Sequence, residues 1–234
     1  MKIVFVDSRI ENDEQNNLIK LGYEVLKCPL SSDLYSAVSG HPDMLMFIVN
    51  SKKIIVHKNM QNEFTARLKK LNIDVISSQN ALKDLYPKDI ILNGVSIANY
   101  FVHKLKNTDT ILLNNLSGKI LINVNQGYTK CSTAIVSPEA IMTSDKKIAE
   151  TFKNLDMDVL YLPPGDIILP GLNYGFIGGC CSLLEKNLMV FYGDLTNYKY
   201  EFEVLSFLKK HFVKPYYLSP RKLIDRGSIF KIEI

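Results

Sequence analysis

The sequence contains no tryptophan, only four arginines and no apolar run long enough to cross a membrane. The arginines are isolated, whereas nucleic-acid-binding surfaces usually have clustered Arg and Lys with aromatic residues between them. The 28 basic and 24 acidic residues leave a net charge of +4. The apolar run Met1–Val6 ends at Asp7, which is too short for a signal peptide. We therefore expect a cytoplasmic protein with neither a membrane nor a nucleic-acid partner, and we interpret Met1–Val6 as a buried strand.

Cysteine is also scarce, and its spacing is not that of a metal site. The four cysteines are Cys28, Cys131, Cys180 and Cys181, and no two of them form a CxxC pair. The His and Asp residues show no helical ligand spacing, and no glycine-rich phosphate-binding motif occurs. The sequence therefore predicts no metal and no cofactor, and the simplest interpretation of the cysteines is free thiols in a reducing compartment.

The most informative feature that is present is an internal repeat. Residues 18–26 (LIKLGYEVL) match residues 68–76 (LKKLNIDVI), and the pattern recurs at residues 152–160 (FKNLDMDVL). Apolar hairpins recur between these copies. We expect strands at 1–6, 23–26, 44–49 and 53–57, helices at 13–21 and 61–71, and further hairpins at 131–144 and 180–193. A repeat of this length is typical of an architecture built from similar modules.

Four full modules of strand, loop, hairpin and helix begin near Tyr23, Ile73, Lys119 and Asp158. A fifth begins at Lys214 and lacks one hairpin strand and one helix, which the N-terminal segments 1–6 and 13–21 can supply. The N-terminal strand would then close the ring and leave no open sheet edge. No linker rich in Pro, Ser or Gly interrupts the chain, so we expect one domain over residues 1–234.

Five strand-rich modules with one helix each resemble the pentein fold, the five-bladed β/α propeller of the guanidine-modifying enzymes. Gly40-His41-Pro42-Asp43 resembles the GHxD text of that superfamily, in which the His is a general acid/base and the Asp holds the guanidinium group. Residues 165–171 (GDIILPG) resemble the glycine–aspartate strand beside its site. The texts QGYTKCSTAIV, MTSD and YGFIGG are similar to a bacterial branch of the superfamily, for which the resemblance implies a fold and no particular activity.

The resemblance has two departures. The nucleophilic cysteine of the deiminases lies near the C-terminus, whereas residues 224–229 (IDRGSI) contain none. The HxD text also lies in the first module instead of the fourth. Because a pseudo-five-fold ring brings equivalent positions to one centre, a different module can supply each role.

Hydrolysis of a guanidine needs a thiolate, a histidine and carboxylates that hold the cation. The predicted catalytic residues are Cys131, His41 and Asp43. The predicted substrate-binding residues are Asp89, Asp166, Asn173, Tyr174, Gly178 and Gly179. The predicted ligand is a small cationic guanidine or amidine compound, similar to arginine. We interpret residues 165–177 as a loop inserted into the fourth blade, and we align Cys131 with Cys180 at the central ends of two blades. Lys130 would lower the thiol pKa of Cys131 if it turned inward.

Simpler interpretations stay open for the same residues. Most free cysteines are small buried apolar residues, which fits Cys131. His41 also fits a surface turn, and Asp166 also fits a turn cap. The missing C-terminal cysteine favours a non-catalytic interaction module, as in the ribosome-associated pentein, or a small-molecule sensor.

Four further polar residues have structural interpretations. Asp145 is predicted to cap a helix, and Asp194 to close a turn. His57 and His103 occupy equivalent strand ends, which we interpret as the outer rim of the ring.

Overall fold

The chain forms five three-stranded sheets in a computed structural model that describes residues 1–234. In spatial order the sheets are β15 (Phe230–Glu233), β1 (Lys2–Asp7) and β2 (Glu24–Cys28); β3 (Met46–Asn50), β4 (Lys53–Val56) and β5 (Asp74–Ser77); β6 (Val95–Ile97), β7 (Tyr100–His103) and β8 (Ile120–Asn123); β9 (Thr133–Ser137), β10 (Ala140–Thr143) and β11 (Asp158–Tyr161); and β12 (Cys181–Glu185), β13 (Leu188–Phe191) and β14 (Lys214–Tyr217). Each sheet combines an antiparallel pair with one parallel strand. The α/β repeat predicted from the sequence is therefore present.

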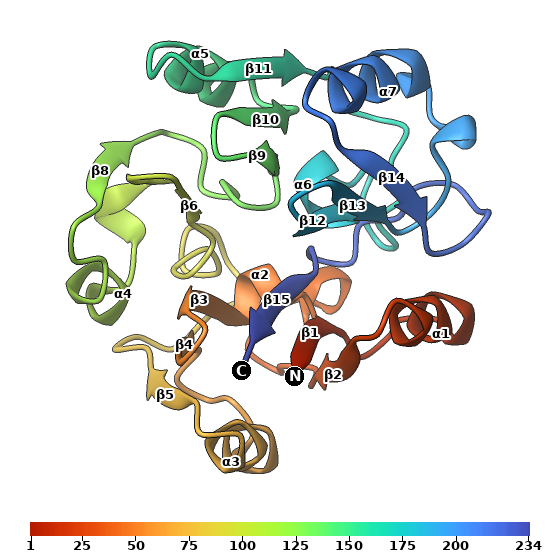
Figure 1. Ribbon diagram of the computed structural model, residues 1–234. Helices are drawn as coiled ribbons and strands as arrows, with labels where there is room; N and C mark the ends of the chain where they lie inside the picture. Colours follow the sequence, from red (N-terminus) through yellow and green to blue (C-terminus); the bar gives the residue numbers. More distant parts are fainter.

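The two ends of the chain share one sheet. Strand β1 pairs antiparallel with β15, where Val4 faces Lys231, and parallel with β2, where Val4 faces Val25. The two termini consequently lie side by side (Figure 1). The predicted pairing of the N-terminal strand with the C-terminal segment is confirmed.

The borders of the modules differ from the prediction. The strand expected to open each module pairs with the hairpin before it, as Ile54 of β4 does with Val75 of β5. A helix connects these two parallel strands, because a parallel pair needs a long crossover connection. The structural unit is therefore hairpin, helix and strand.

Five helices lie on the periphery, one for each sheet (Figure 1). They are α1 (Asn12–Lys20), α3 (Asn62–Lys70), α4 (Thr110–Asn114), α5 (Lys146–Lys153) and α7 (Glu201–Lys210). Asp145 caps α5 by accepting a hydrogen bond from Ile148 N at 2.8 Å, and Asp194 closes its turn by accepting one from Thr196 N at 2.9 Å. Both predicted caps are confirmed. None of the helices combines the length and apolar character that a membrane crossing requires.

Two single helical turns lie near the centre, and they overlap the beginnings of the predicted strand 44–49 and the predicted hairpin 180–193. They are α2 (Pro42–Leu45) and α6 (Ile177–Cys180), so β3 begins at Met46 and β12 at Cys181. Pro42 favours the first turn because its φ is already helical. The thiols of Cys180 and Cys181 both donate to the carbonyl of Ile177, at 3.2 and 3.1 Å. All four cysteines are free and buried.

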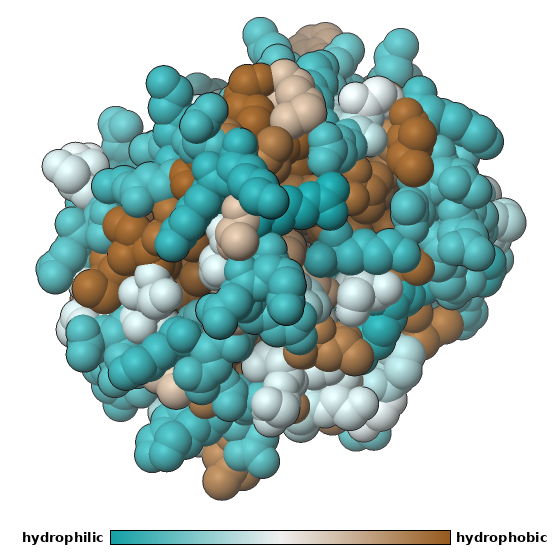
Figure 2. Space-filling view, turned by 90° about the horizontal axis from the view of Figure 1, so that it is seen from below, coloured by the Kyte–Doolittle hydropathy of each residue, from teal (hydrophilic) through white to brown (hydrophobic).

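The middle strand of each sheet holds most of the core. All five residues that follow Lys2 in β1 are buried, as are all four of β10, whereas β5 and β8 have no buried residue. The face of the molecule in Figure 2 is mainly hydrophilic, with apolar side chains in separate patches. The core is therefore concentrated along the middle strands, and the parallel strands β5 and β8 add no buried residue to it.

The first strands of all five sheets surround the centre. Side chains of β3, β6, β9, β12 and β15 line one cavity of about 340 Å³. Five connections return the chain to this centre, namely residues 29–41, 78–94, 124–132, 162–176 and 218–229. The stretch interpreted as an insertion at 165–177 belongs to one of these connections. Because the connection at 78–94 is longer than that at 162–176, the fourth blade carries no special insertion.

Candidate functional site

A second cavity, of about 330 Å³, opens among the connecting loops. Its lining comes from four of the five connections. The lining residues are Tyr35, Val38, His41, Tyr128, Cys131, Leu169, Leu172, Asn173, Tyr174, Phe176 and Asp225. Two of the three predicted catalytic residues, Cys131 and His41, therefore face the same space.

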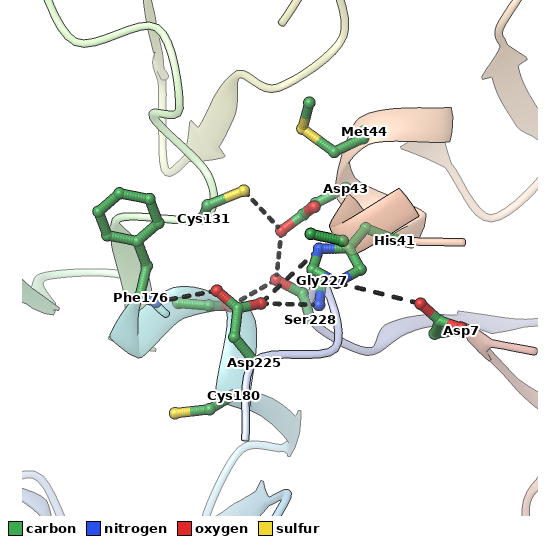
Figure 3. Close-up of polar contacts among 12 residues, drawn as sticks. Asp7, His41, Asp43, Met44, Cys131, Phe176, Cys180, Asp225, Gly227 and Ser228 are labelled. Carbon is green, nitrogen blue, oxygen red and sulfur yellow. Dashed lines mark hydrogen bonds and ion pairs between the residues drawn. The ribbon is translucent and has the colours of Figure 1, made fainter. Parts of the chain in front are cut away.

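Cys131 is held at the cavity wall by two polar partners. Its Sγ atom lies 3.3 Å from Oδ2 of Asp43 and 3.1 Å from Nδ2 of Asn93 (Figure 3 shows the contact with Asp43). Oδ1 of Asn93 also accepts from the backbone nitrogens of Lys130 and Cys131, at 2.9 and 3.2 Å. Burial raises the pKa of the Cys131 thiol well above its usual value, and the carboxyl groups of Asp43 and Asp225 raise it further. The thiol of the free protein is therefore protonated.

His41 lies between two carboxyl groups. Its Nδ1 atom is 3.7 Å from Oδ1 of Asp225, and its Nε2 atom is 4.0 Å from Oδ2 of Asp7 (Figure 3). Burial lowers the pKa of His41, and the two carboxyl groups only partly oppose this effect. Nδ1 has no hydrogen-bond partner. A neutral imidazole is therefore available to accept a proton.

Asp225 forms the inner end of the cavity. Its Oδ2 atom accepts from the backbone nitrogen of Phe176 at 2.8 Å, and Oδ1 accepts from that of Gly227 at 3.0 Å. Burial raises the pKa of the Asp225 carboxyl group, although nearby His41 acts in the opposite direction. A side chain at Gly179 would clash with this carboxylate, so the glycine is what leaves room for it.

A buried network lies behind Cys131. Ser228 Oγ is 3.1 Å from Oδ2 of Asp43 and also donates to the carbonyl of Gly178. Nζ of Lys130 donates to Ser228 Oγ at 2.7 Å and to Gly178 O at 3.2 Å. Lys130 thus turns toward the other cavity, which it lines. The expectation that Lys130 lowers the thiol pKa of Cys131 is contradicted, because the nearby carboxyl groups and burial raise it.

The remaining predicted residues lie in several places. Asn173 and Tyr174 line the cavity. Asp89 is buried behind its wall and accepts from the hydroxyl of Tyr128. Asp166 lies apart from these groups, where it accepts from Lys222 Nζ at 3.0 Å and from Lys199 N at 2.8 Å.

The two predicted glycines act by packing. A side chain at Gly178 would meet the carbonyl oxygens of Lys130 and Thr133, and one at Gly179 would meet Asp225. Both glycines therefore let the helical turn α6 pack closely against the segments that carry Lys130 and Asp225.

The predicted equivalence of Cys131 and Cys180 is wrong by one residue. Tyr192 N donates to Cys180 O, as Ser144 N does to Ser132 O. Cys180 is therefore equivalent to Ser132. The position equivalent to Cys131 in its blade is Gly179, which explains why only one of the two thiols reaches the cavity.

His57 and His103 are buried, which contradicts their predicted place on the outer rim. Nδ1 of His103 lies 2.7 Å from Oγ1 of Thr108, and Nε2 lies 3.1 Å from the carbonyl of Gly127. His57 directly follows β4 and His103 is the last residue of β7, so both imidazoles lie at the end of a middle strand and are buried.

Sequence reasoning missed Asp225, Asn93, Tyr128, Phe176 and Ser228. One signal was visible, because Asp225 and Ser228 occupy the last-module stretch in which the missing cysteine was noted. The aromatic residues gave no local signal, since they come together only through the fold. Ring centroids of Tyr128 and Phe176 are 6.3 Å apart, and those of Tyr174 and Phe176 are 6.0 Å apart.

The fold is that of the pentein superfamily. SxtG, an amidinotransferase of the saxitoxin pathway from Microseira wollei, superposes with a TM-score of 0.59 over 92% of this chain and 87% of its own, at 11% identity. Substrate-bound agmatine deiminase from C. jejuni gives 0.57 over 98% and 92%, at 11% identity. Citrulline-bound DDAH from Pseudomonas aeruginosa gives 0.55 over 93% and 92%, at 8% identity. At these identities the likeness shows the fold alone.

Residues 5–230 match DUF6873, a family of unknown function, and the chain belongs to that family. No curated protein matches the sequence.

Proposed function

We propose that the chain is a closed five-bladed propeller and that the cavity among its connecting loops, called the loop-side cavity below, binds a small guanidinium or amidinium compound. Cys131 attacks the central carbon of this compound. The observation that carries this proposal is that Cys131, His41 and Asp225 line one cavity. These side chains are a nucleophile, a base and a carboxylate, which are the groups that hydrolysis of a guanidine requires.

The electrostatics of the site favour a cation. Burial raises the pKa of Asp43, of Asp89 and of Asp225. A cationic ligand stabilises the charged forms of nearby carboxyl groups and of a thiolate, so its binding lowers their pKa values. Cys131 would then become a nucleophile only when the cation is bound, which protects the empty site from oxidation.

The proposed reaction uses protons that the site already holds. With the cation bound, the thiol proton passes to Asp43 and Sγ of Cys131 forms a bond to the central carbon. The proton leaves with the departing ammonia or amine as the carbon–nitrogen bond breaks. Neutral His41 then takes a proton from water, whose oxygen displaces the sulfur. As the carbon–sulfur bond breaks, the proton on His41 passes to the sulfur, which restores the thiol and the neutral imidazole. The second proton of the water ends on the released ammonia or amine, so the products are a urea compound and an ammonium ion.

The similar folds support this proposal by analogy. Their names refer to amidino transfer, agmatine deimination and dimethylarginine hydrolysis. Because one fold can carry several functions, the argument rests on the side chains of the cavity.

A second candidate function is binding without chemistry, as in a sensor or an interaction module. The specific observation that favours it is the buried, protonated thiol of Cys131, which is 4% exposed. A thiol that stays protonated with the ligand bound would act only as part of the wall.

Product analysis and calorimetry distinguish these functions. The protein is incubated with agmatine, arginine and simple alkylguanidines, and the release of ammonia and of urea compounds is measured. Turnover that is lost in Cys131→Ala and kept in Cys180→Ala supports catalysis, since Cys180 is a buried cysteine outside the cavity. Binding without product or Cys131 adduct supports the second candidate. Failure of every guanidinium and amidinium compound to bind would remove both.

A further inference from the structure

We infer that the compound bound in the loop-side cavity has an uncharged, apolar tail beyond its cationic head. This inference rests on the proposed function and concerns the other end of the same ligand. It assigns alkyl- or aryl-substituted guanidines and amidines as the ligand class, in place of amino acids that carry a guanidinium group.

The cavity is polarised along its depth. The ionisable groups His41 and Asp225 lie at its buried end, each with no more than 3% of its surface exposed. Leu172 and Tyr174 are 49% and 41% exposed and therefore form the rim. A cationic head is attracted inward by Asp225, so the tail of the ligand extends past these two side chains.

The wall between the two ends is apolar. Eight of the eleven lining residues are hydrophobic, and none is Lys or Arg. The rings of Tyr128 and Phe176 are nearly parallel, with an interplanar angle of 28°. Flat aromatic faces contact aliphatic chains and aryl rings over a large area, and this contact stabilises binding through the hydrophobic effect.

Two cations beside this wall are held by polar groups outside the cavity. Nε of Arg9 donates to Oδ1 of Asp7 at 2.9 Å, and its other nitrogens bond to Asp7 and to the carbonyls of Ser36 and Ala37. Nζ of Lys104 donates to the hydroxyl of Tyr86 at 2.5 Å. A carboxylate on the ligand would therefore enter a rim whose lining residues include no cation.

Charge complementarity then determines the ligand class. Moving a carboxylate from water to an apolar surface without a partner is strongly unfavourable when it is fully buried, and less so at a half-exposed rim. An ammonium tail has the same desolvation cost. A singly charged compound with an alkyl or aryl tail has no such cost, and its tail gains contact with the wall.

The test compares ligands that share one chain length and differ at one end. Isothermal titration calorimetry is performed on the unsubstituted protein and on Cys131→Ala, which prevents turnover. The ligands are n-butylguanidine, γ-guanidinobutyrate and agmatine, with n-butylurea as the compound that lacks the cationic head. We expect n-butylguanidine to bind about tenfold or more tightly than γ-guanidinobutyrate and agmatine, and n-butylurea not to bind measurably.

A charge placed at the rim provides the matched variant. Leu172→Arg supplies a partner for a carboxylate, and its position is exposed enough to tolerate the longer side chain. We expect this variant to bind γ-guanidinobutyrate about tenfold more tightly than the unsubstituted protein does. Phe202→Arg is the control, because Phe202 is a 79% exposed residue of the peripheral helix α7, and we expect no change in it.

The outcomes distinguish a failure of the inference about the ligand's tail from a failure of the proposed binding of its cationic head. Equal or tighter binding of γ-guanidinobutyrate or agmatine than of n-butylguanidine by the unsubstituted protein overturns this inference and leaves the proposed function intact. An unchanged preference in Leu172→Arg also overturns it. If none of the guanidines binds, the proposed function itself fails.

Discussion

The Sγ atom of Cys131 lies 3.3 Å from Oδ2 of Asp43, and Asp43 is fully buried. Two groups that would both be negative after deprotonation thus share one hydrogen bond away from solvent. The carboxyl group raises the pKa of the thiol, and burial raises the pKa of both groups. The thiol is accordingly protonated until the charge balance of the cavity changes.

The first prediction concerns the reactivity of this thiol. Asp43→Asn keeps the shape of the side chain and removes its charge, so the pKa of Cys131 should fall. One pKa unit corresponds to a tenfold change in thiolate fraction, and we expect alkylation by iodoacetamide to accelerate about threefold to tenfold at a fixed pH below the thiol pKa. Mass spectrometry of the peptide that contains Cys131 measures the rate.

Asp166→Asn serves as the control for this experiment, because Asp166 pairs with Lys222 away from the cavity. Its rate should match that of the unsubstituted protein. A slower or unchanged rate in a folded Asp43→Asn protein would show that Asp43 does not suppress the thiolate.

The second prediction compares two buried serines. Ser228 Oγ contacts Asp43, Lys130 and Gly178, whereas Ser219 Oγ is buried without a partner. Removing a hydroxyl whose partners stay buried costs about 1–3 kcal/mol, whereas removing an unpaired one is neutral or stabilising. Ser228→Ala should therefore lower the free energy of unfolding by that amount, and Ser219→Ala should not. Urea denaturation measures both, and equal effects would contradict the role of the network.

The repeat made the fold predictable from the sequence. Strand β1 and its pairing with the C-terminal segment were predicted because the fifth module lacked what the N-terminus supplies. Residues 165–177 were misinterpreted as an insertion, because loops have no periodicity and their lengths are compared reliably only when the sheets are known. The module border was misplaced for a related reason: the sequence gives the order of β4, α3 and β5 but not which strands pair.

The residues of the candidate site were predictable only where a short sequence motif surrounds them. Cys131 and His41 each have a recognisable neighbourhood, and both line the cavity. Asp225 lies far from them in the chain and reaches His41 only because the first and last segments share one sheet. Asn93 positions Cys131 by accepting from its backbone nitrogen and by contacting its Sγ atom, and it also accepts from the backbone nitrogen of Lys130 and donates to the carbonyl of Asp43. Such a role depends on contacts across blades, which no single stretch of sequence displays.

The third prediction concerns the acid stability of the fold. Burial lowers the pKa of His103 to about 4, against about 6.5 in an unfolded chain. Because the carbonyl of Gly127 can only accept, Nε2 of His103 carries the single proton of the neutral ring. Between these two pKa values the unfolded state binds a proton that the native state does not, so stability falls as the pH decreases.

This single histidine should contribute up to about 3 kcal/mol to that loss. In His103→Gln the contribution is absent, so the difference in unfolding free energy between the two proteins should shrink as the pH falls from 6.5 toward 4. Buried carboxyl groups with raised pKa values act in the opposite direction, but they are common to both proteins and cancel in the difference. Denaturation of both proteins at several pH values measures this difference. Stability curves that run parallel would refute the contribution of His103 to the acid sensitivity.

The last prediction tests whether Gly179 is required by the carboxylate of Asp225. A methyl group at this position would clash with that carboxylate, and the backbone cannot yield, because the carbonyl of Gly179 accepts from the nitrogens of Arg226 at 3.1 Å and Ser228 at 2.8 Å. Gly179→Ala should therefore displace Asp225, lower stability by about 1–3 kcal/mol and weaken guanidinium binding about tenfold or more. Gly165→Ala is the control: its φ of +108° is strained for alanine, yet nothing lies within 4 Å, so stability alone should fall.

Combining Gly179→Ala with Asp225→Gly removes the clash. A double-mutant cycle should then recover stability without recovering affinity, and additive stability losses would show that the two residues are not coupled.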